Sequence, residues 1–479
     1  MGLTEHLLID GDRRPAIAGQ HSTLIDPATG EAWATIAAGD AQDVDAAVQA
    51  AERSRAGWRK VNSRDRTQIL TRLAALIRDH LEPLAQLESR NVGKPICEAR
   101  EEVNLAADCF EYYAGAINKV GGQTIPVAAA GTSLTFREPI GVCGLIAPWN
   151  FPIAITAWKV APALAMGNTI VLKPASQTPL TALRLAELAL EAGVPPGVFN
   201  VVTGSGTTVG DALVRHPLVR KVSFTGSTEV GTQVMKLAAD DIKRVTLELG
   251  GKSANLVFAD ADLDLAAPKA MWSVLGNAGQ DCCARSRILV QRSVYDTFLE
   301  KLIQQFQSLT IGVPLEDATQ ISCLISTAHR DRVLNYIHVG QAEGATLCYG
   351  GTIPTHPELA QGAYLTPAIF ANVQPTMRIA REEIFGPVVC VIPFDTEAEA
   401  IAIANDSLYG LSGSIWTRDI GRALRVAKAI ETGVLSINTG HSVHLEAPFG
   451  GVKRSGLGRE LGMAVLDHYS EYKSIFIAE

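Results

Sequence analysis

The segment GVCGLIAPWNFP, residues 141–152, decides the fold class. Its apolar and β-branched first half reads as a buried strand, and its two prolines then hold the backbone stiffly in a turn. Similar short runs follow at residues 169–172, 199–202, 221–224 and 245–247, each before a helical stretch or a Gly/Pro turn. This alternation is typical of parallel strands with crossover helices. It predicts a doubly wound unit, in which ligands bind at the carboxyl ends of the strands.

The same alternation resumes after Gly250-Gly251, with strand candidates at residues 254–258, 288–291, 388–393, 412–416 and 434–438. We therefore expect a second α/β unit. Upstream, Asp10-Gly11 predicts a hairpin, residues 26–30 a loop, and residues 43–113 a helical region by their periodicity. Residues 132–137 and 472–477 alternate like edge strands that belong to neither unit, which suggests an oligomerisation flap.

The predicted fold class is α/β, with two doubly wound Rossmann-like domains and a small β flap for oligomerisation. The predicted cofactor-binding domain comprises residues 1–118 and 140–249, and the catalytic domain residues 250–448. Residues 119–139 and 461–479 are assigned to the oligomerisation strands. A chain of 479 residues is long enough for two or three domains.

Composition excludes several classes of protein. Hydrophobic residues make up 47% and charged residues 19% of the chain, as in a folded globular enzyme. No apolar run reaches the length of a membrane span, and residues 1–11 lack the features of a secretory signal, so we expect no membrane partner and a cytoplasmic location. The net charge of −8 without a basic block argues against nucleic acid.

The eight cysteines form no metal-spaced CxxC pair and no disulfide framework, so we expect reduced thiols, mostly in the core, and no metal.

Three strand-to-helix junctions carry polar groups to one predicted crevice. Residues 148–152 follow the first strand, and Lys173 with Ser176 places an ammonium and a hydroxyl after the second. Residues 224–231, FTGSTEVG, join a strand to a helix through glycines, so that backbone N–H groups face a pyrophosphate if the turn binds one. Such a turn is equally often purely structural.

A sharper signal joins Glu248, in the segment ELGGK, to Cys282, in GQDCCA. A cysteine in a polar, glycine-led loop is placed for attack on a substrate, and a carboxylate before a Gly-Gly turn can swing toward it. The alternative is a buried thiol and a solvated glutamate.

Taken together, these motifs resemble those of the aldehyde dehydrogenase superfamily, in the family's order and from about residue 20 to the C-terminus. The matching segments are PWNFP (148–152), KP (173–174), FTGS (224–227), ELGGK (248–252), GQ with Cys282, EEIFGP (382–387), and PFGG (448–451) with Lys453, Ser455 and Gly456.

The resemblance implies a thiolate attack by Cys282 on an aldehyde, giving a thiohemiacetal whose oxyanion is held by Asn150 Nδ2 and the Cys282 N–H. Loss of hydride to a nicotinamide leaves a thioester, which water hydrolyses with Glu248 as general base. Glu383 matches the residue that holds the nicotinamide ribose, Phe385 packs near the nicotinamide ring, and Lys173 matches the adenine-ribose anchor.

The cofactor is thus NAD or NADP, and the candidate residues that bind it are Ile146, Ala147, Pro148, Trp149, Lys173, Ser176, Phe224, Thr225, Gly226, Ser227, Gly231, Leu249, Gly250, Glu383 and Phe385. Members that prefer NAD often carry a glutamate where this chain has Ser176. Since a neutral hydroxyl does not repel a 2′-phosphate, we expect NADP to be accepted. Which cofactor is preferred stays open.

Three neighbours of these candidates are assigned lesser roles. The family's Gly-Gln-any-Cys spacing selects Cys282, so Cys283 is expected in the pocket wall, and of Glu382 and Glu383 only one can face the ribose. Glu460 matches a position tied to a water path, but a glutamate that opens a terminal helix also compensates the helix dipole.

The substrate pocket implied by the resemblance is lined by Phe151, Ile155, Trp158, Val443 and Phe449, an aromatic and aliphatic throat for medium-sized aldehydes. His441, His444 and Glu446 precede Pro448 and either recognise a polar or cationic tail or are simply solvated. They lack the third fixed ligand that a metal needs.

Two rival functions remain. An acylating relative would release its thioester to coenzyme A, which the hydrolytic base Glu248 disfavours; a non-catalytic binding protein would not keep the set of Asn150, Glu248, Cys282 and Glu383. The predicted partners are a small aldehyde and further copies of the chain, as a homodimer or homotetramer.

Overall fold

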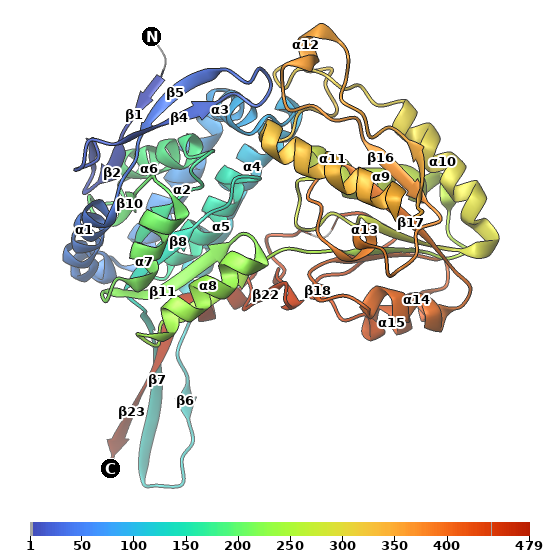
Figure 1. The fold of residues 1–479 in the computed structure, drawn as a ribbon. Helices are drawn as coiled ribbons and strands as arrows, with labels where there is room; N and C mark the ends of the chain where they lie inside the picture. The colour runs from blue at the N-terminus through green and yellow to red at the C-terminus, as the bar shows by residue number, and fades with distance from the viewer. Residues whose placement is uncertain (1–2, 442) are drawn as a thin grey trace.

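A computed structural model describes residues 3–441 and 443–479 of the chain. Residues 1 and 2 of the predicted N-terminal segment lie outside this range. Figure 1 shows two α/β units side by side, with a narrow antiparallel sheet projecting from the first of them. The predicted fold class is confirmed: each unit is built on a mainly parallel sheet that is covered by helices.

The first unit contains an eight-stranded sheet in the order β22-β12-β11-β8-β9-β10-β2-β3. Its parallel centre contains all the strands predicted for this unit: β8 (Val142–Ile146), β9 (Thr169–Lys173), β10 (Phe199–Val201), β11 (Val219–Thr225) and β12 (Arg244–Glu248). From β8 the chain adds β9 and β10 on one side, and later β11 and β12 on the other. The strand order therefore reverses between β8 and β11, and a ligand crevice is expected at the carboxyl ends of these two strands.

Antiparallel strands close both edges of this sheet. The hairpin of β2 (Leu7–Ile9) and β3 (Asp12–Arg14) turns at Asp10 and Gly11, both with positive φ (58° and 85°), which matches the twist of a two-residue turn. The hairpin predicted at Asp10-Gly11 is thus confirmed. At the other edge, β22 (Gly456–Leu457) returns from the C-terminal region to pair with β12.

A small separate sheet contains β1 (Leu3–Glu5), β5 (Ala32–Ala37) and β4 (His21–Ile25). The sequence predicted only the loop at residues 26–30, which here joins β4 to β5. The two strands were missed because polar and apolar residues do not alternate clearly in them; β4, for example, exposes Ile25.

The helices of the first unit include the region predicted as helical, residues 43–113, and further helices that follow its strands. They are α1 (Ala41–Lys60), α2 (Ser63–Asp79), α3 (Leu81–Val92), α4 (Ile96–Ala116), α5 (Pro152–Ala165), α6 (Leu180–Ala192), α7 (Asp211–Arg215) and α8 (Thr228–Ala239). Local capping fixes several of the starts: the Asp40 carboxylate accepts hydrogen bonds from the N–H groups of Gln42 and Asp43 before α1. No helix in the described part of the chain is long and apolar enough to span a membrane.

The second unit has a seven-stranded sheet in the order β15-β16-β17-β14-β13-β19-β20. Its strands are β13 (Ala254–Val257), β14 (Arg287–Gln291), β15 (Thr346–Tyr349), β16 (Ala368–Ala371), β17 (Val388–Phe394), β19 (Gly413–Trp416) and β20 (Ser436–Ile437). Every strand predicted here is present, although β20 is shorter than the predicted run of residues 434–438. The sequence did not predict β15 and β16.

The remaining elements surround this sheet. The helices are α9 (Leu263–Leu275), α10 (Tyr295–Gln307), α11 (Thr327–Ala342), α12 (Pro357–Ala360), α13 (Arg378–Arg381), α14 (Glu397–Asn405) and α15 (Ile420–Ala429). A two-stranded ribbon pairs β18 (Tyr409–Gly410) with β21 (Val452–Lys453). The domain boundaries given above stay predictions.

The projecting sheet is formed by β6 (Thr124–Ile125), β7 (Gly131–Pro139) and β23 (Ser470–Ala478). Strands β7 and β23 are the two that the sequence assigned to neither unit, and they pair with each other over their whole length, from Ser470 opposite Pro139 to Ala478 opposite Gly131. This pairing was not predicted. It leaves β23 at the edge of the sheet.

Candidate active site

A cavity of about 1080 Å³ lies where the strand order of the first sheet reverses, large enough for a dinucleotide. The first unit contributes the turns after β8, β9, β11 and β12, and the second unit contributes α11 with Glu382, Glu383 and Phe385. The predicted residues that line it are Ile146, Ala147, Pro148, Trp149, Asn150, Lys173, Ser176, Phe224, Thr225, Gly226, Ser227, Glu248, Leu249, Gly250, Cys282, Glu383 and Phe385.

Gly231 is the predicted cofactor residue that the structure keeps away from this cavity. It lies in the second turn of α8, and a Cβ atom there would come within 2.4 Å of the Leu249 side chain. The glycine therefore makes room for Leu249, which itself lines the cavity. The structure thus gives Gly231 a packing role, and its contact with the cofactor stays a prediction.

The Gly250-Gly251 turn brings the two units into contact. A Cβ at Gly250 would lie 2.1 Å from Glu383 Oε2, and one at Gly251 would lie 2.4 Å from the carbonyl oxygen of Cys282. The Gly251 N–H donates a 2.9 Å hydrogen bond to Glu383 Oε1. Burial raises the pKa of Glu383 to about 7. Only glycine allows the Glu383 carboxylate and the Cys282 loop to approach this turn so closely.

The loop that carries Cys282 leaves α9 through three consecutive left-handed residues, Asn277 (φ 50°), Ala278 (φ 53°) and Gly279 (φ 76°). A Cβ at Gly279 would lie 2.3 Å from the Gly386 carbonyl oxygen, so this position requires glycine. Such strain persists only where the surroundings hold it. Hydrogen bonds hold Asn277 in this conformation. Its N–H donates to Glu98 Oε2 at 2.8 Å, and its Nδ2 donates to the Asn150 carbonyl at 2.8 Å.

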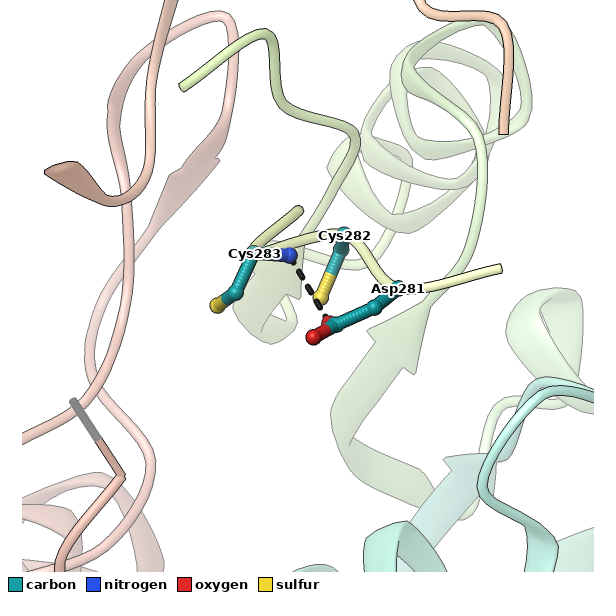
Figure 2. Close-up of side chains that lie close together, drawn as sticks. All are labelled: Asp281, Cys282 and Cys283. Atoms are coloured by element: carbon teal, nitrogen blue, oxygen red, sulfur yellow. Dashed lines mark hydrogen bonds between the residues drawn. The ribbon is translucent and has the colours of Figure 1, made fainter. Parts of the chain in front are cut away.

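Cys282 and Cys283 differ in their surroundings. Cys282 lines the cavity and is half-buried, whereas Cys283 is 5% exposed and packs in the hydrophobic core. A hydrogen bond with the Cys283 thiol and burial raise the pKa of the Cys282 thiol well above its usual range. Figure 2 shows the Cys282 sulfur beside the Asp281 carboxylate, with the Cys283 side chain directed away from it. Of the adjacent pair, the predicted nucleophile is thus the one that faces the cavity.

Asn150 is placed to use one of its two amide hydrogens. Its Nδ2 donates to the Gln280 carbonyl at 3.0 Å, which leaves the second hydrogen for another acceptor. Its own backbone carbonyl accepts hydrogen bonds from Lys94 Nζ at 2.9 Å and from Asn277 Nδ2. Asn150 is 3% exposed, so its orientation is fixed by these contacts.

A buried charged network, which the sequence analysis did not identify, supports this turn. Helix α5 has no side-chain N-cap; instead Glu88 accepts from the Ile153 N–H at 3.0 Å and Glu102 from the Ala154 N–H at 3.2 Å. Lys94 forms an ion pair with Glu102. In the sequence these residues look like ordinary helix-surface charges. The Gly93-Lys94-Pro95 break between two helices was the one signal that they differ.

Glu248 is buried, and among the described residues no group forms a hydrogen bond of normal geometry with either carboxylate oxygen. Burial and the nearby charge of Glu460 raise the pKa of Glu248 well above its usual range, opposed by Lys159 and Arg459. A carboxyl whose pKa is raised toward the working pH is suited to accept a proton.

Glu460 does not open a helix, so the dipole interpretation is wrong. It pairs with Phe449 in a β-bridge, and the following short helix begins at Ala464. Its buried Oε1 accepts hydrogen bonds from Lys159 Nζ at 2.8 Å and from Ser223 Oγ at 2.9 Å. The ion pair with Lys159 explains how a carboxylate is kept in this core.

Lys173 and Ser176 lie together after β9. Ser176 Oγ donates to the Gly204 carbonyl at 2.8 Å, and Lys173 Nζ donates to the Pro174 carbonyl at 2.9 Å. Burial lowers the pKa of Lys173 to about 8. A partly desolvated ammonium gains more from an anionic partner than an exposed one does.

One end of the cavity is walled by aromatic rings. Phe385 has a positive φ of 61°, unusual for a bulky side chain, and its ring meets Trp149 edge-on with centroids 5.3 Å apart. His329 Nε2 lies 2.7 Å from the Phe385 carbonyl oxygen. His329 and other cavity residues of α11, Arg332 and Tyr336, carry no motif, and the sequence analysis missed them.

The predicted substrate residues form an apolar cluster on which Cys282 also packs. Ile155, Trp158 and Phe449 are buried, and Phe151 and Val443 are partly buried against the same cluster. Trp158 and Phe449 meet edge-on at 5.4 Å. Within the described residues none of the five lines the large cavity, so Cys282 contacts both the cavity and this cluster.

The histidine loop before Pro448 lies at the surface. His441 and His444 stack edge-on at 5.0 Å, and both are exposed, as is Glu446. Among the residues described, the group with metal-like spacing is a different one, Asp281, Cys282 and Cys283.

The fold and the cavity define a doubly wound α/β enzyme with a dinucleotide-sized site that ends at a cysteine and a buried glutamate. The model of the aldehyde dehydrogenase family matches residues 16–475. The chain belongs to this family and is an oxidoreductase.

Similar proteins cover almost the whole chain. The betaine aldehyde dehydrogenase of Bacillus subtilis is 43% identical over 478 residues, 99% of this chain and 97% of the relative. Among solved structures, an NAD-dependent aldehyde dehydrogenase from Sinorhizobium meliloti is 42% identical with a TM-score of 0.97, covering 99% of this chain and 95% of the other. A betaine aldehyde dehydrogenase from Staphylococcus aureus, solved with NAD⁺, is 40% identical with a TM-score of 0.97, covering 99% and 94%.

Proposed function

We propose that this chain oxidises an aldehyde to a carboxylic acid with NAD or NADP, through a thioester on Cys282. The observation that carries the proposal is that Cys282, Glu248, Asn150 and Glu383 line one cavity. The residues present fit a dinucleotide: Thr225 lines the cavity and its buried hydroxyl has no partner among the described residues, and the N-terminus of α8 opens there. The nicotinamide, when bound, supplies the acceptor for hydride.

The chain's own residues account for the other requirements. Cys282 forms the bond to the aldehyde carbon, and the oxyanion is held by the second Asn150 amide hydrogen and by the Cys282 N–H, which donates to no acceptor within residues 3–441 and 443–479. Glu248 then takes a proton from the water that hydrolyses the thioester. A buried base on the cavity wall favours water over coenzyme A as the acyl acceptor.

The test is the formation of NAD(P)H with a panel of aldehydes, with and without coenzyme A. An acid product, with no increase in rate on adding coenzyme A, is expected. The apolar cluster around Trp158 and Phe449 favours medium-sized aldehydes, and the exposed histidine loop would add selectivity for a polar or cationic tail. If no aldehyde leads to reduction of the cofactor, the non-catalytic alternative is supported. If the product is a coenzyme A thioester, the acylating alternative is supported.

Cofactor choice is tested at Ser176. We expect measurable activity with NADP as well as NAD, and Ser176→Glu should raise the KM for NADP far more than that for NAD. Two unit charges about 4 Å apart interact by roughly 4 kcal/mol at an intermediate dielectric, so even a partial effect exceeds tenfold. The matched control is Ser176→Gln, which has the same length without the charge. If wild type does not use NADP, or if Glu and Gln act alike, another group selects the cofactor.

We also propose that the chain assembles into a homodimer or homotetramer through the projecting sheet. Strand β23 lies at its edge and exposes Tyr472, Phe476 and Ile477 at 62%, 50% and 54%. An exposed apolar edge is a liability that added strands remove. A cytoplasmic location is supported by the cysteines, all eight of which are free thiols.

Light scattering should therefore give a mass of at least twice the 51.0 kDa of one chain. Phe476→Glu should shift the protein toward the monomer because it places a charge in the contact. The control is Leu424→Glu, a residue of similar exposure on α15 of the second unit. A stable, active wild-type monomer, or equal dissociation in both variants, would contradict the assignment.

A further inference from the structure

The Asp281–Ala284 segment folds into a tight turn that gathers three potential metal ligands. The Ala284 N–H donates to the Asp281 carbonyl at 3.0 Å, and the Cys283 N–H donates to Asp281 Oδ1 at 2.9 Å. Adjacent side chains on an extended strand would point to opposite faces. In this turn, both Sγ atoms and a carboxylate oxygen of Asp281 instead lie within 4.8 Å of one another, with the Cys282 sulfur drawn next to the Asp281 carboxylate in Figure 2.

Two sulfurs and one carboxylate oxygen form a ligand set for a thiophilic divalent cation. Zn²⁺ binds thiolate at about 2.3 Å and carboxylate at about 2.0–2.2 Å in a tetrahedron, which places two sulfur ligands roughly 3.8 Å apart. Ligand atoms already within 4.8 Å need only small side-chain rotations to reach that geometry. The fourth position would be filled by water from the cavity that Cys282 lines.

The surroundings allow a cation to enter and to be held. Cys282 faces the cavity, while Cys283 is fixed by the core, so one sulfur is accessible and the other is preorganised. Glu383 contributes negative charge close to Cys282, and Arg285 contributes the opposing positive charge close to Cys283. Because the Arg285 guanidinium is bonded to the Gly440 carbonyl, it does not occupy the space between the thiols.

We propose that Asp281, Cys282 and Cys283 bind one thiophilic divalent cation such as Zn²⁺ or Cd²⁺, and that the bound ion blocks the enzyme by occupying the Cys282 sulfur. Binding releases the two thiol protons to solvent, and no electrons are transferred. The ion is an inhibitor here and no part of the proposed reaction. The inhibitory half of the inference rests on the proposed function, whereas the binding half does not.

The experiment therefore measures binding and inhibition separately. Wild-type protein is dialysed against buffered Zn²⁺, and its turnover is followed over the same range of free Zn²⁺; Cd²⁺ binding is read from the ultraviolet absorbance of Cd–thiolate bonds. We expect one ion per chain, inhibition with the same midpoint as binding, and recovery on adding a chelator. Cys283→Ala should retain most of its turnover without metal but bind Zn²⁺ about tenfold or more weakly, and Zn²⁺ should inhibit its remaining turnover correspondingly less.

Two further variants keep the test decisive. Cys283→Ser retains a small polar side chain in case alanine disturbs the core, and should also lose affinity. Cys348→Ala removes a half-buried thiol on β15 and should change neither binding nor inhibition. Equal affinity in wild type and both Cys283 variants would overturn the proposal, as would bound metal that leaves turnover unchanged. If wild type has no turnover at all, the proposed function fails while the dialysis still decides the binding site.

Discussion

Cys282→Ala is expected to abolish aldehyde-dependent formation of NAD(P)H, whereas Cys283→Ala should retain most of it. Cys282 lines the cavity, whereas Cys283 is 5% exposed and lies in the core. Removing a covalent nucleophile typically costs roughly 10⁴-fold or more in turnover, because water or a neighbouring group cannot form the same intermediate. Initial rates for both variants, at saturating aldehyde and cofactor, measure the difference.

The control is the fold of each variant. Cys283→Ala removes a buried sulfur at a cost of about 1 kcal/mol of stability, so thermal unfolding should still show a single folded protein. Cys282→Ala leaves the core intact and should unfold as wild type does. Equal loss of activity in two folded variants would refute the choice between the adjacent thiols.

Much of this arrangement could be predicted because parallel strands bring their carboxyl ends together. The turns after β8, β9, β11 and β12 were identified from short apolar runs that end in proline, glycine or a polar residue. Once the strand order reverses between β8 and β11, these turns converge whatever the details of packing. The meeting of these turns at one crevice follows from topology, whereas the role of each residue on them came from the resemblance to the aldehyde dehydrogenase family.

Other parts depend on contacts that no local pattern encodes. In the sequence the polar residues of α11 look solvated, although several of them line the cavity. Lys94, Glu88 and Glu102 become buried only when α3, α4 and α5 pack together. Gly231 lies in a motif beside the cavity, and the structure adds a contact that the motif did not reveal: its missing side chain accommodates Leu249. The long pairing of β7 with β23 joins segments more than 300 residues apart, which periodicity cannot reveal.

Glu248→Gln is expected to separate the two halves of the reaction in time. Thioester formation and hydride transfer precede hydrolysis, so a variant without the base should still release one equivalent of NAD(P)H per site in a burst and then turn over slowly. General-base catalysis contributes about 10²–10⁴-fold, and the steady state should fall by that order. Rapid-mixing absorbance measures the burst, and the accumulated thioester can be trapped with hydroxylamine.

The dependence on pH gives this prediction a second, independent readout. Burial and Glu460 raise the pKa of Glu248, so at low pH the carboxyl is protonated and cannot accept a proton from water; hydrolysis in wild type should therefore accelerate as the pH rises through that pKa. In Glu248→Gln the slow steady-state rate should no longer increase with pH in this way, because glutamine does not titrate. The rate of the burst should still increase with pH, because the Cys282 thiol must lose its proton before it attacks the aldehyde. If the burst disappears together with the steady state in a folded variant, Glu248 acts before hydride transfer, as the group that deprotonates Cys282.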